Sequence, residues 1–396
     1  MRFVLFYHSL VSDWNHASAH TLRGIATELL DLGHSVSVLE PENGWSLHNL
    51  LEQGGQGMVK AFHATYPGLR SRFYDPDHLD LDETLADADV VIAHEWTDAG
   101  LLRRLGQHRA HARGYRLLFH DAPHGSLRLP VELRGQLLGD YDGVLASSEA
   151  LRGLYEERDW AARVWTWRDA VDTRIFRPGS ADPNPSLDLI WIGNWGNGER
   201  ASELNEYLID PIRALRLRAR FFGARYPVEA LRTLRAAGID HGGWVPDFGI
   251  PAVLASGRFT VHVPRHMHAD GLPHTPSLRA LQALACGIPL VTTHWDECED
   301  MFTPGVDLLV GRDGPQIQRY LIDLQHDAAL GRSLAANGLA TVLSRHCCAV
   351  RVTELLGICQ RLGAGARRPK DDFPHPPGGA RRATRGGRSH APAAWS

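Results

Sequence analysis

One stretch, residues 277–291, constrains the fold more than any other part of the chain. In its first half, apolar side chains recur with the 3.6-residue period of a helix, and small residues lie between them. Gly287 follows, and glycine ends helices readily because it adopts the left-handed conformation without a Cβ clash. Pro289 prevents the helix from resuming, and the apolar residues after it predict a buried strand. A short helix leading into a buried strand indicates an α/β core whose ligand lies at the helix N-terminus.

The rest of the chain alternates strands and helices in two series. The first series predicts elements over residues 3–7, 21–32, 35–39, 90–94, 99–111, 115–120, 141–146, 149–157 and 163–167. Within it, residues 43–78 are rich in glycine and polar side chains and predict an excursion with one short helix. The second series predicts elements over residues 187–192, 219–223, 228–237, 250–256, 259–263, 277–285, 290–293, 307–310, 316–325, 328–343 and 347–362.

This alternation predicts parallel sheets covered by helices on both faces. We expect an N-terminal Rossmann-like domain over residues 1–170 and a C-terminal one over 187–345, with a proline-rich linker over 171–186. The last helix, over residues 346–363, is expected to cross back to the N-terminal domain. Two such domains would face a central cleft.

Composition excludes several classes of protein. The chain of 396 residues has a formal net charge of only −4, so nucleic acid is not expected as a partner. No apolar run is long enough to span a membrane, and the N-terminal residues predict a strand rather than a signal peptide. The five cysteines have no C-x-x-C spacing, which favours reduced thiols and a cytoplasmic location. Residues 364–396 carry seven basic against two acidic side chains and predict a disordered basic tail.

Cationic side chains just past two strands suggest a site for a diphosphate. Arg200 follows the glycine loop that begins at Gly193 and Asn194, and Arg265 follows the strand at 259–263. Ligands of parallel sheets bind beyond the carboxyl ends of the strands, and diphosphates bind arginine, backbone N–H groups and helix N-termini. The alternative for each residue is an arginine on the surface. The glycine loop alone is weak evidence, because it is neither G-x-G-x-x-G nor a P-loop.

Polar clusters end three strands of the N-terminal series and are candidates for the acceptor side. The cluster after the first strand includes His8, Asp13, Trp14, Asn15 and His16, and His94 and Glu95 end the strand at 90–94. His120 and Asp121 end the next strand, where a histidine could act as general base on an acceptor hydroxyl. Each histidine could equally make a structural hydrogen bond at a strand end.

The stretch from Gln282 to Leu290 resembles the signature of retaining glycosyltransferases of the GT-B fold, which commonly reads Glu-Ala-(Met/Leu)-Ala-(Cys/Ser)-Gly-x-Pro-Val. Residues 171–178 resemble the interdomain connection of the same family, although any proline-rich linker could look alike. The clusters at 8–16, 94–96 and 119–121, followed by Trp191-Ile192-Gly193-Asn194-Trp195, resemble the spore-maturation-protein CgeB-like branch over most of residues 1–362.

The resemblance implies an α/β fold of the GT-B type and transfer of a hexose from a nucleoside-diphosphate sugar, with retention, to a glycan, protein or small molecule. No tightly bound cofactor or metal is implied. It places the donor against Gly193, Asn194, Arg200, Trp244, Val245, Arg265, Ser277, Leu278 and Gln282. The backbone near Trp244 would contact the base, although Trp244 could equally be a core residue. The catalytic positions would be His120, Asp121, Asp270 and Arg265.

The acidic positions depart from the family pattern of two glutamates. Gln282 stands where the second glutamate is usual, and it can still hydrogen-bond a ribose hydroxyl. The other glutamate of the pattern would stand eight positions before Gln282, where this chain has His274. We expect the nearby Asp270 to be the acid that contacts the sugar instead. The register between the two remains open, and the departure bears on the identity of the donor and on activity.

Two other functions fit parts of the sequence. His266, His268 and Asp270 alternate after a strand, as the ligands of zinc hydrolases do, although Gly271 stands where that motif has a further histidine. A protein that binds a nucleotide sugar without catalysis is the other alternative, favoured by Gln282.

Overall fold

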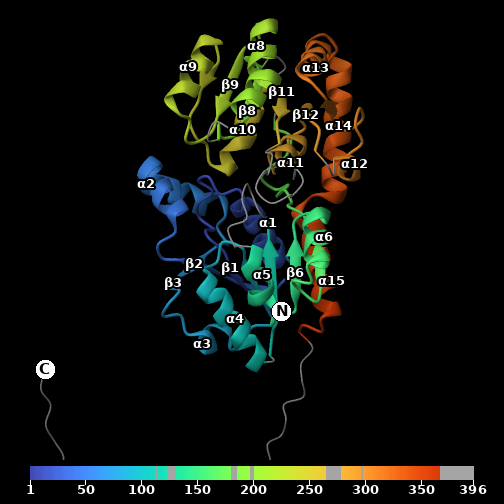
Figure 1. The fold of residues 1–396 in the computed structure, drawn as a ribbon. Coiled ribbons are helices and arrows are strands. Elements are labelled where there is room, and N and C mark those ends of the chain that lie inside the picture. The colour runs from blue at the N-terminus through green and yellow to red at the C-terminus, as the bar shows by residue number, and fades with distance from the viewer. Residues whose placement is uncertain are drawn as a thin grey trace, which may run out of the picture. The chain divides into compact units, whose positions relative to one another are not determined.

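A computed structural model describes residues 1–112, 114–122, 131–179, 185–196, 200–264, 278–295 and 298–365. The described residues form two parallel α/β sheets (Figure 1). The predicted fold class is therefore confirmed.

The N-terminal sheet has seven strands in the order β3-β2-β1-β4-β5-β6-β7, all parallel. The order reverses between β1 and β4, where Phe3 pairs with Val90. Its strands are β1 (Arg2–Phe6), β2 (Ser35–Pro41), β3 (Ser71–Tyr74), β4 (Val90–His94), β5 (Arg116–Asp121), β6 (Gly143–Ala146) and β7 (Val164–Thr166). The helices between them are α1 (Ser18–Asp31), α2 (Trp45–Thr65), α3 (Leu81–Leu85), α4 (Ala99–His111), α5 (Val131–Leu138) and α6 (Glu149–Glu157).

The C-terminal sheet has six parallel strands in the order β10-β9-β8-β11-β12-β13 and reverses between β8 and β11. Its strands are β8 (Leu187–Ile192), β9 (Ala219–Phe222), β10 (Asp240–His241), β11 (Gly257–His262), β12 (Leu290–Thr293) and β13 (Leu309–Gly311). Its helices are α7 (Ala201–Leu204), a π-helical turn (Asn205–Ile209), α8 (Asp210–Leu215), α9 (Val228–Ala236), a 3₁₀ turn (Asp247–Gly249), α10 (Ile250–Leu254), α11 (Leu278–Ala285), α12 (Cys298–Met301), α13 (Gly314–His326), α14 (Ala328–Arg345) and α15 (Cys348–Arg361).

The excursion expected over residues 43–78 is wrong in one respect. Most of it is the 21-residue helix α2, and β3 follows. The three glycines in α2 suggested a loop, yet Leu50 and Phe62 are buried and pack into the protein, which stabilises the helix. Gly55 has φ 61° and breaks the helical geometry there, a conformation that glycine tolerates best.

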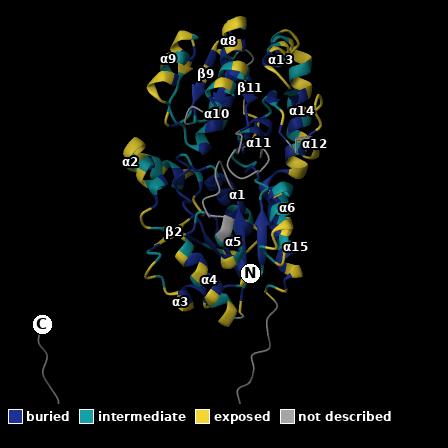
Figure 2. Cartoon of the chain, in the orientation of Figure 1, coloured by how far each residue is buried: buried dark blue, intermediate teal, exposed yellow. Residues whose placement is uncertain are grey.

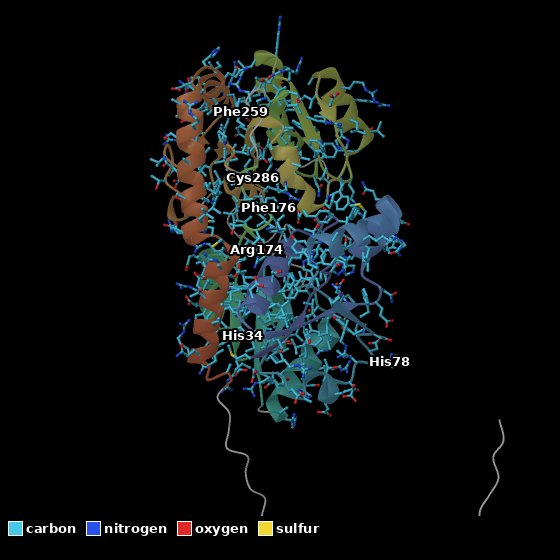
Figure 3. The ribbon with its side chains drawn as sticks, turned by 180° about the vertical axis from the view of Figure 1, so that it is seen from behind. His34, His78, Arg174, Phe176, Phe259 and Cys286 are labelled. Atoms are coloured by element: carbon cyan, nitrogen blue, oxygen red, sulfur yellow. The ribbon has the colours of Figure 1, made fainter. Side chains whose placement is uncertain are left out.

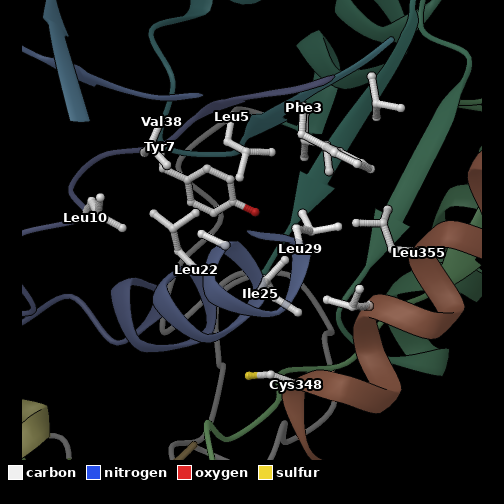
Figure 4. Close-up of a cluster of buried hydrophobic side chains, with 14 of the residues drawn as sticks. Phe3, Leu5, Tyr7, Leu10, Leu22, Ile25, Leu29, Val38, Cys348 and Leu355 are labelled. Atoms are coloured by element: carbon white, nitrogen blue, oxygen red, sulfur yellow. The ribbon is translucent and has the colours of Figure 1, made fainter. Parts of the chain in front are cut away.

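The last helix packs on the first. Cys348 and Leu355 of α15 lie in one apolar cluster with Ile25 and Leu29 of α1 (Figure 4). A bridge between Val171 and Cys347 starts this contact. The guanidinium of Arg174, a residue labelled in Figure 3, holds the linker to α1 through an ion pair with Glu28 (3.1 Å). The strands of both sheets are largely buried, and many exposed residues lie on the outer helices (Figure 2). Among the described helices, none combines the length and hydropathy that a membrane span needs.

Candidate functional site

A cavity of about 210 Å³ opens between residues of the two sheets. Its lining includes segments that follow β8 and β11, the pair at which the C-terminal sheet reverses its order. From the N-terminal half it is lined by Asp13, Asn15, His16, Ala17, Ser147, Arg168 and Asp169. Such a switch point is where open parallel sheets bind their ligands.

The glycine loop after β8 forms one wall and contacts the N-terminal half. Gly193 and Gly223 approach so closely that a Cβ on Gly223 would lie 2.1 Å from the Gly193 carbonyl oxygen. Asn194 Oδ1 accepts a hydrogen bond from the Ala224 N–H (2.9 Å), and its amide nitrogen donates to Asn15 Oδ1. The loop is therefore fixed by both halves of the chain.

Arg200 lies beside this loop, is only 6% exposed and lines the cavity. Its guanidinium donates to the carbonyl oxygens of Asn194 (3.4 Å) and Val263. Burial and the positive charge of Arg200 lower the pKa of His262 to about 3, so that imidazole is neutral at physiological pH. The wall between β8 and β11 thus presents a buried cation.

A chain of polar contacts ends at Gln282 on α11. Arg279 Nη1 donates to Gln282 Oε1 (2.7 Å) and also to Asp247 Oδ1 (2.7 Å). Asp247 and Gln282 are 1% and 0% exposed. Burial alone would raise the pKa of the Asp247 carboxyl, but the positive charges of Arg279, His20 and Arg23 outweigh it and lower that pKa.

The same chain of contacts continues into the N-terminal half through Asp13. The Asp247 backbone N–H donates to Asp13 Oδ2. Arg23, fully buried, lies 3.4 Å from that carboxylate and donates to the carbonyl oxygens of Leu10 (2.7 Å) and Val11 (2.9 Å). Burial, and next the negative charge of Asp247, raise the pKa of Asp13 to about 7, and Arg23 opposes the shift.

The raised pKa of Asp13 predicts a specific pH dependence of stability. The folded protein keeps the Asp13 proton up to about pH 7, whereas the unfolded chain loses it near pH 4. The contribution of Asp13 to stability is therefore fully present below about pH 4 and falls as pH rises to about 7. Relative to the variant D13N, the wild type should lose at least about 1 kcal/mol of unfolding free energy between pH 4 and 7.5. Urea denaturation of both proteins across this range measures the difference.

His20 provides the internal control. Burial lowers its pKa to about 4, so its stabilisation is lost as pH falls from about 6.5 toward 4, the opposite direction. That loss occurs in wild type and D13N alike and cancels in the comparison. Parallel pH curves for the two proteins would contradict the raised pKa of Asp13.

The N-terminal histidines form an aromatic cluster. His8 stacks on Trp45 (ring centroids 4.8 Å apart) and contacts His16 (5.1 Å) and Trp96 (5.2 Å). His120 Nδ1 lies 2.7 Å from the Tyr7 hydroxyl oxygen, and its ring centroid lies 5.1 Å from that of His94. Among the described residues that line the cavity, His16 is the one member of this histidine cluster.

The chain was compared with known proteins. Residues 200–357 match a family described as glycosyl transferase-like. No curated protein sequence matches the chain significantly. Among solved structures, HepE of Anabaena in complex with UDP and glucose is similar, with a TM-score of 0.65, 13% identity, and 91% of this chain and 100% of that chain covered.

Two further solved structures are similar to about the same extent. The sucrose-phosphate synthase of Thermosynechococcus elongatus covers 92% of this chain and 99% of its own, with a TM-score of 0.61 and 13% identity. TarM of S. aureus has a TM-score of 0.62 and 8% identity over 90% and 99% of the two chains. The chain has the GT-B fold of such glycosyltransferases, and its residues 200–357 match the glycosyl transferase-like family.

The contacts of Asp121 bear on the catalytic role predicted for it. Successive residues of a strand face opposite sides of a sheet, so Asp121 and His120 diverge. The Asp121 carboxylate is fully buried in an ion pair with Arg134 and accepts a hydrogen bond from the Tyr155 hydroxyl (2.7 Å). These contacts favour a structural role for Asp121, and its catalytic role stays a prediction. His120 is likewise buried, in the cluster with Tyr7, and is not part of the described cavity lining.

The other predicted positions divide into three groups. Gly193, Asn194, Arg200, Trp244, Val245 and Gln282 line the cavity together with Asp13, Asn15 and His16. Leu278 is 3% exposed in an apolar cluster, and His8, Trp14, His94 and Glu95 are buried outside the cavity lining. Arg265, Asp270 and Ser277 lie outside the described residues, as do His266 and His268 of the metal alternative.

The sequence interpretation missed Asp247, Arg279, Ser147, Arg168 and Asp169. Arg279 had a local signal, because a residue three positions before Gln282 shares its helix face. Asp247 had none, since its contacts with Arg279 and Asp13 join segments distant in sequence. In the part of the chain that the structure describes, no group of three or more His, Cys, Asp or Glu side chains could hold a metal ion.

Proposed function

We propose that this glycosyltransferase transfers a hexose from a UDP-sugar to an acceptor hydroxyl, with retention at the anomeric carbon. The observation that carries the proposal is the cavity between the two sheets, where the buried cation of Arg200 and the amide of Gln282 lie at one switch point. Similar structures support UDP as the nucleotide, because HepE and an α-glucosyltransferase are described in complex with UDP. We also propose that the chain lies in the CgeB-like branch, is cytoplasmic and needs no tightly bound cofactor.

Each part of the donor has a proposed partner. Arg200, with Arg265, would bind the diphosphate, since guanidinium groups make charge-assisted hydrogen bonds to phosphate oxygens. The backbone at Trp244 and Val245 would contact the base, with Gly193 and Asn194 bounding the phosphates. Gln282 would meet the ribose, and Asp270 would orient the hexose. The two domains are proposed over residues 1–170 and 187–345.

The reaction that follows needs no covalent nucleophile. The bond between the anomeric carbon and the diphosphate oxygen breaks, and the cations stabilise the charge that develops on the leaving UDP. The acceptor oxygen forms the new bond on the same face, and its proton passes to a phosphate oxygen of the departing UDP. His16 and Asn15 line the cavity from the N-terminal half and are the proposed acceptor-side contacts.

A thermal-shift series tests the donor site. UDP, GDP, dTDP and ADP are added at saturating concentration, with and without EDTA. A ligand at about 100 times its Kd stabilises the native state by about 2.7 kcal/mol, so UDP should raise Tm by several degrees and the other nucleotides by less. Hydrolysis of UDP-glucose by the same preparation then reports turnover.

Two results would overturn this proposal. Equal shifts with all four nucleotides would reject UDP as the preferred donor. No shift with any of them, together with a loss of stability in EDTA, would reject the donor site and favour a metal bound by His266, His268 and Asp270.

A further inference from the structure

The amide of Gln282 has one orientation that the surrounding charges allow. Its Oε1 accepts from the Arg279 guanidinium (2.7 Å), and rotating the amide by 180° would bring two donors together. Gln282 Nε2 is fully buried and has no hydrogen-bond partner among the described residues. Since Gln282 lines the cavity, a bound ligand could supply the hydrogen-bond acceptor that this NH₂ group lacks.

Asp247 fixes the guanidinium that sets this orientation. One nitrogen, Arg279 Nη1, serves both Asp247 Oδ1 and Gln282 Oε1, each at 2.7 Å. The backbone of Asp247 is in turn bonded to Asp13, and its side chain is 2% exposed. Arg279 therefore has little freedom to turn away from Gln282.

We propose that Asp247 and Arg279 are positioning residues that hold Gln282 as a hydrogen-bond donor toward an acceptor oxygen of the bound nucleotide. The inference rests on the proposed function, because it takes the ligand of this cavity to be a nucleoside diphosphate. The acceptor oxygen belongs either to a ribose hydroxyl or to the diphosphate, and both accept from an NH₂ group.

The ion pair of Arg279 with Asp247 also explains why position 282 has a glutamine in place of the usual glutamate. The charge of Arg279 is already balanced by the carboxylate of Asp247, which accepts its hydrogen bond. A glutamate at 282 would add a buried carboxylate without a cation of its own, which is costly. Glutamine keeps the hydrogen bond to Arg279 and adds no charge to the cluster.

A double-mutant cycle read by UDP affinity tests the positioning role. UDP binding is measured by calorimetry for Q282M, R279M and the double variant. Each single change should weaken UDP about 10-fold, and the double variant about 10-fold rather than 100-fold, because Arg279 acts through Gln282. R279K can donate to both acceptors from one ammonium group and should stay within about 3-fold of wild type. R232M, on the exposed side of α9, is the matched control and should bind as wild type.

Folding is controlled in the same series. If R279M fails to fold because Asp247 is left without its cation, R279M/D247N removes both charges and should show the same weakened binding. Additive losses in the cycle, or unchanged affinity in R279M, would overturn the positioning role. A wild type that does not bind UDP would instead reject the proposed function, so the two failures are distinguishable.

Q282E and substrate fragments identify the acceptor oxygen. A carboxylate accepts a hydrogen bond from a ribose hydroxyl but repels a phosphate oxygen. If the acceptor oxygen is on the ribose, the affinity of Q282E for UDP should stay within about 10-fold of wild type. Q282M should then weaken the binding of uridine by the same factor as that of UDP. If the acceptor oxygen is on the diphosphate, Q282E should weaken the binding of UDP about 100-fold. The binding of uridine, which has no diphosphate, should then be unchanged in Q282M. UDP binding that is unchanged in Q282M and in Q282E would overturn the contact altogether.

Discussion

Replacing Arg134 by methionine should lower the free energy of unfolding by about 3–5 kcal/mol. The side chains of Arg134 and Asp121 are both 0% exposed, and they form an ion pair. Without the guanidinium, the Asp121 carboxylate would remain in the core with the Tyr155 hydroxyl as its hydrogen-bond donor (2.7 Å). A buried charge that has lost its partner is far more costly than a buried pair. Urea denaturation of wild type and R134M measures the loss.

A second variant separates the effect of charge from that of volume. R134M/D121N removes both charges and leaves an amide that can still accept from Tyr155, so it should be more stable than R134M. R213M breaks an ion pair whose side chains are 61% and 64% exposed and should change stability by less than about 0.5 kcal/mol. If R134M costs no more than R213M, the buried pair is not a structural element of this domain.

The sequence predicted elements best where burial and periodicity agree. The predictions for 90–94, 99–111, 149–157 and 290–293 have the same bounds as β4, α4, α6 and β12. The prediction failed at α2, where glycines interrupt the pattern and the helix depends on Phe62 packing into the core. The helical segment at 201–215 was also missed, because its π-helical turn disturbs the 3.6-residue period.

Candidate site residues could be predicted as far as parallel topology determines them. Side chains that follow neighbouring strands meet at one edge, which is why Arg200 and Asn194 were chosen from their positions alone. The directions in which the side chains of His120 and Asp121 point could not be predicted, because the two residues are adjacent in the sequence. Only the packing of β5 shows that Asp121 faces Arg134. The contact of Asp247 with Arg279 spans 32 positions, and no spacing rule predicts it.

Replacing Arg200 by methionine should weaken UDP binding and lower the rate of sugar transfer by about 100-fold. Arg200 places a guanidinium, 6% exposed, in the cavity wall beside the glycine loop. In such a poorly solvated place a charge-assisted hydrogen bond to phosphate is stronger than it would be at the surface. Calorimetry with UDP and initial rates with UDP-glucose measure the two effects.

Comparing R200K with R200M shows whether the charge or the geometry of Arg200 matters for UDP binding. R200K keeps the charge but lacks the planar fork, so it should recover part of the affinity and remain below wild type. R213M, an exposed arginine of α8 in the same half of the chain, should bind UDP as wild type. Arg200 also donates to the carbonyl oxygens of Asn194 and Val263, so R200M should lower Tm slightly even without ligand. An R200M protein that is less stable yet binds UDP with wild-type affinity would show that Arg200 supports the loop and does not contact the diphosphate.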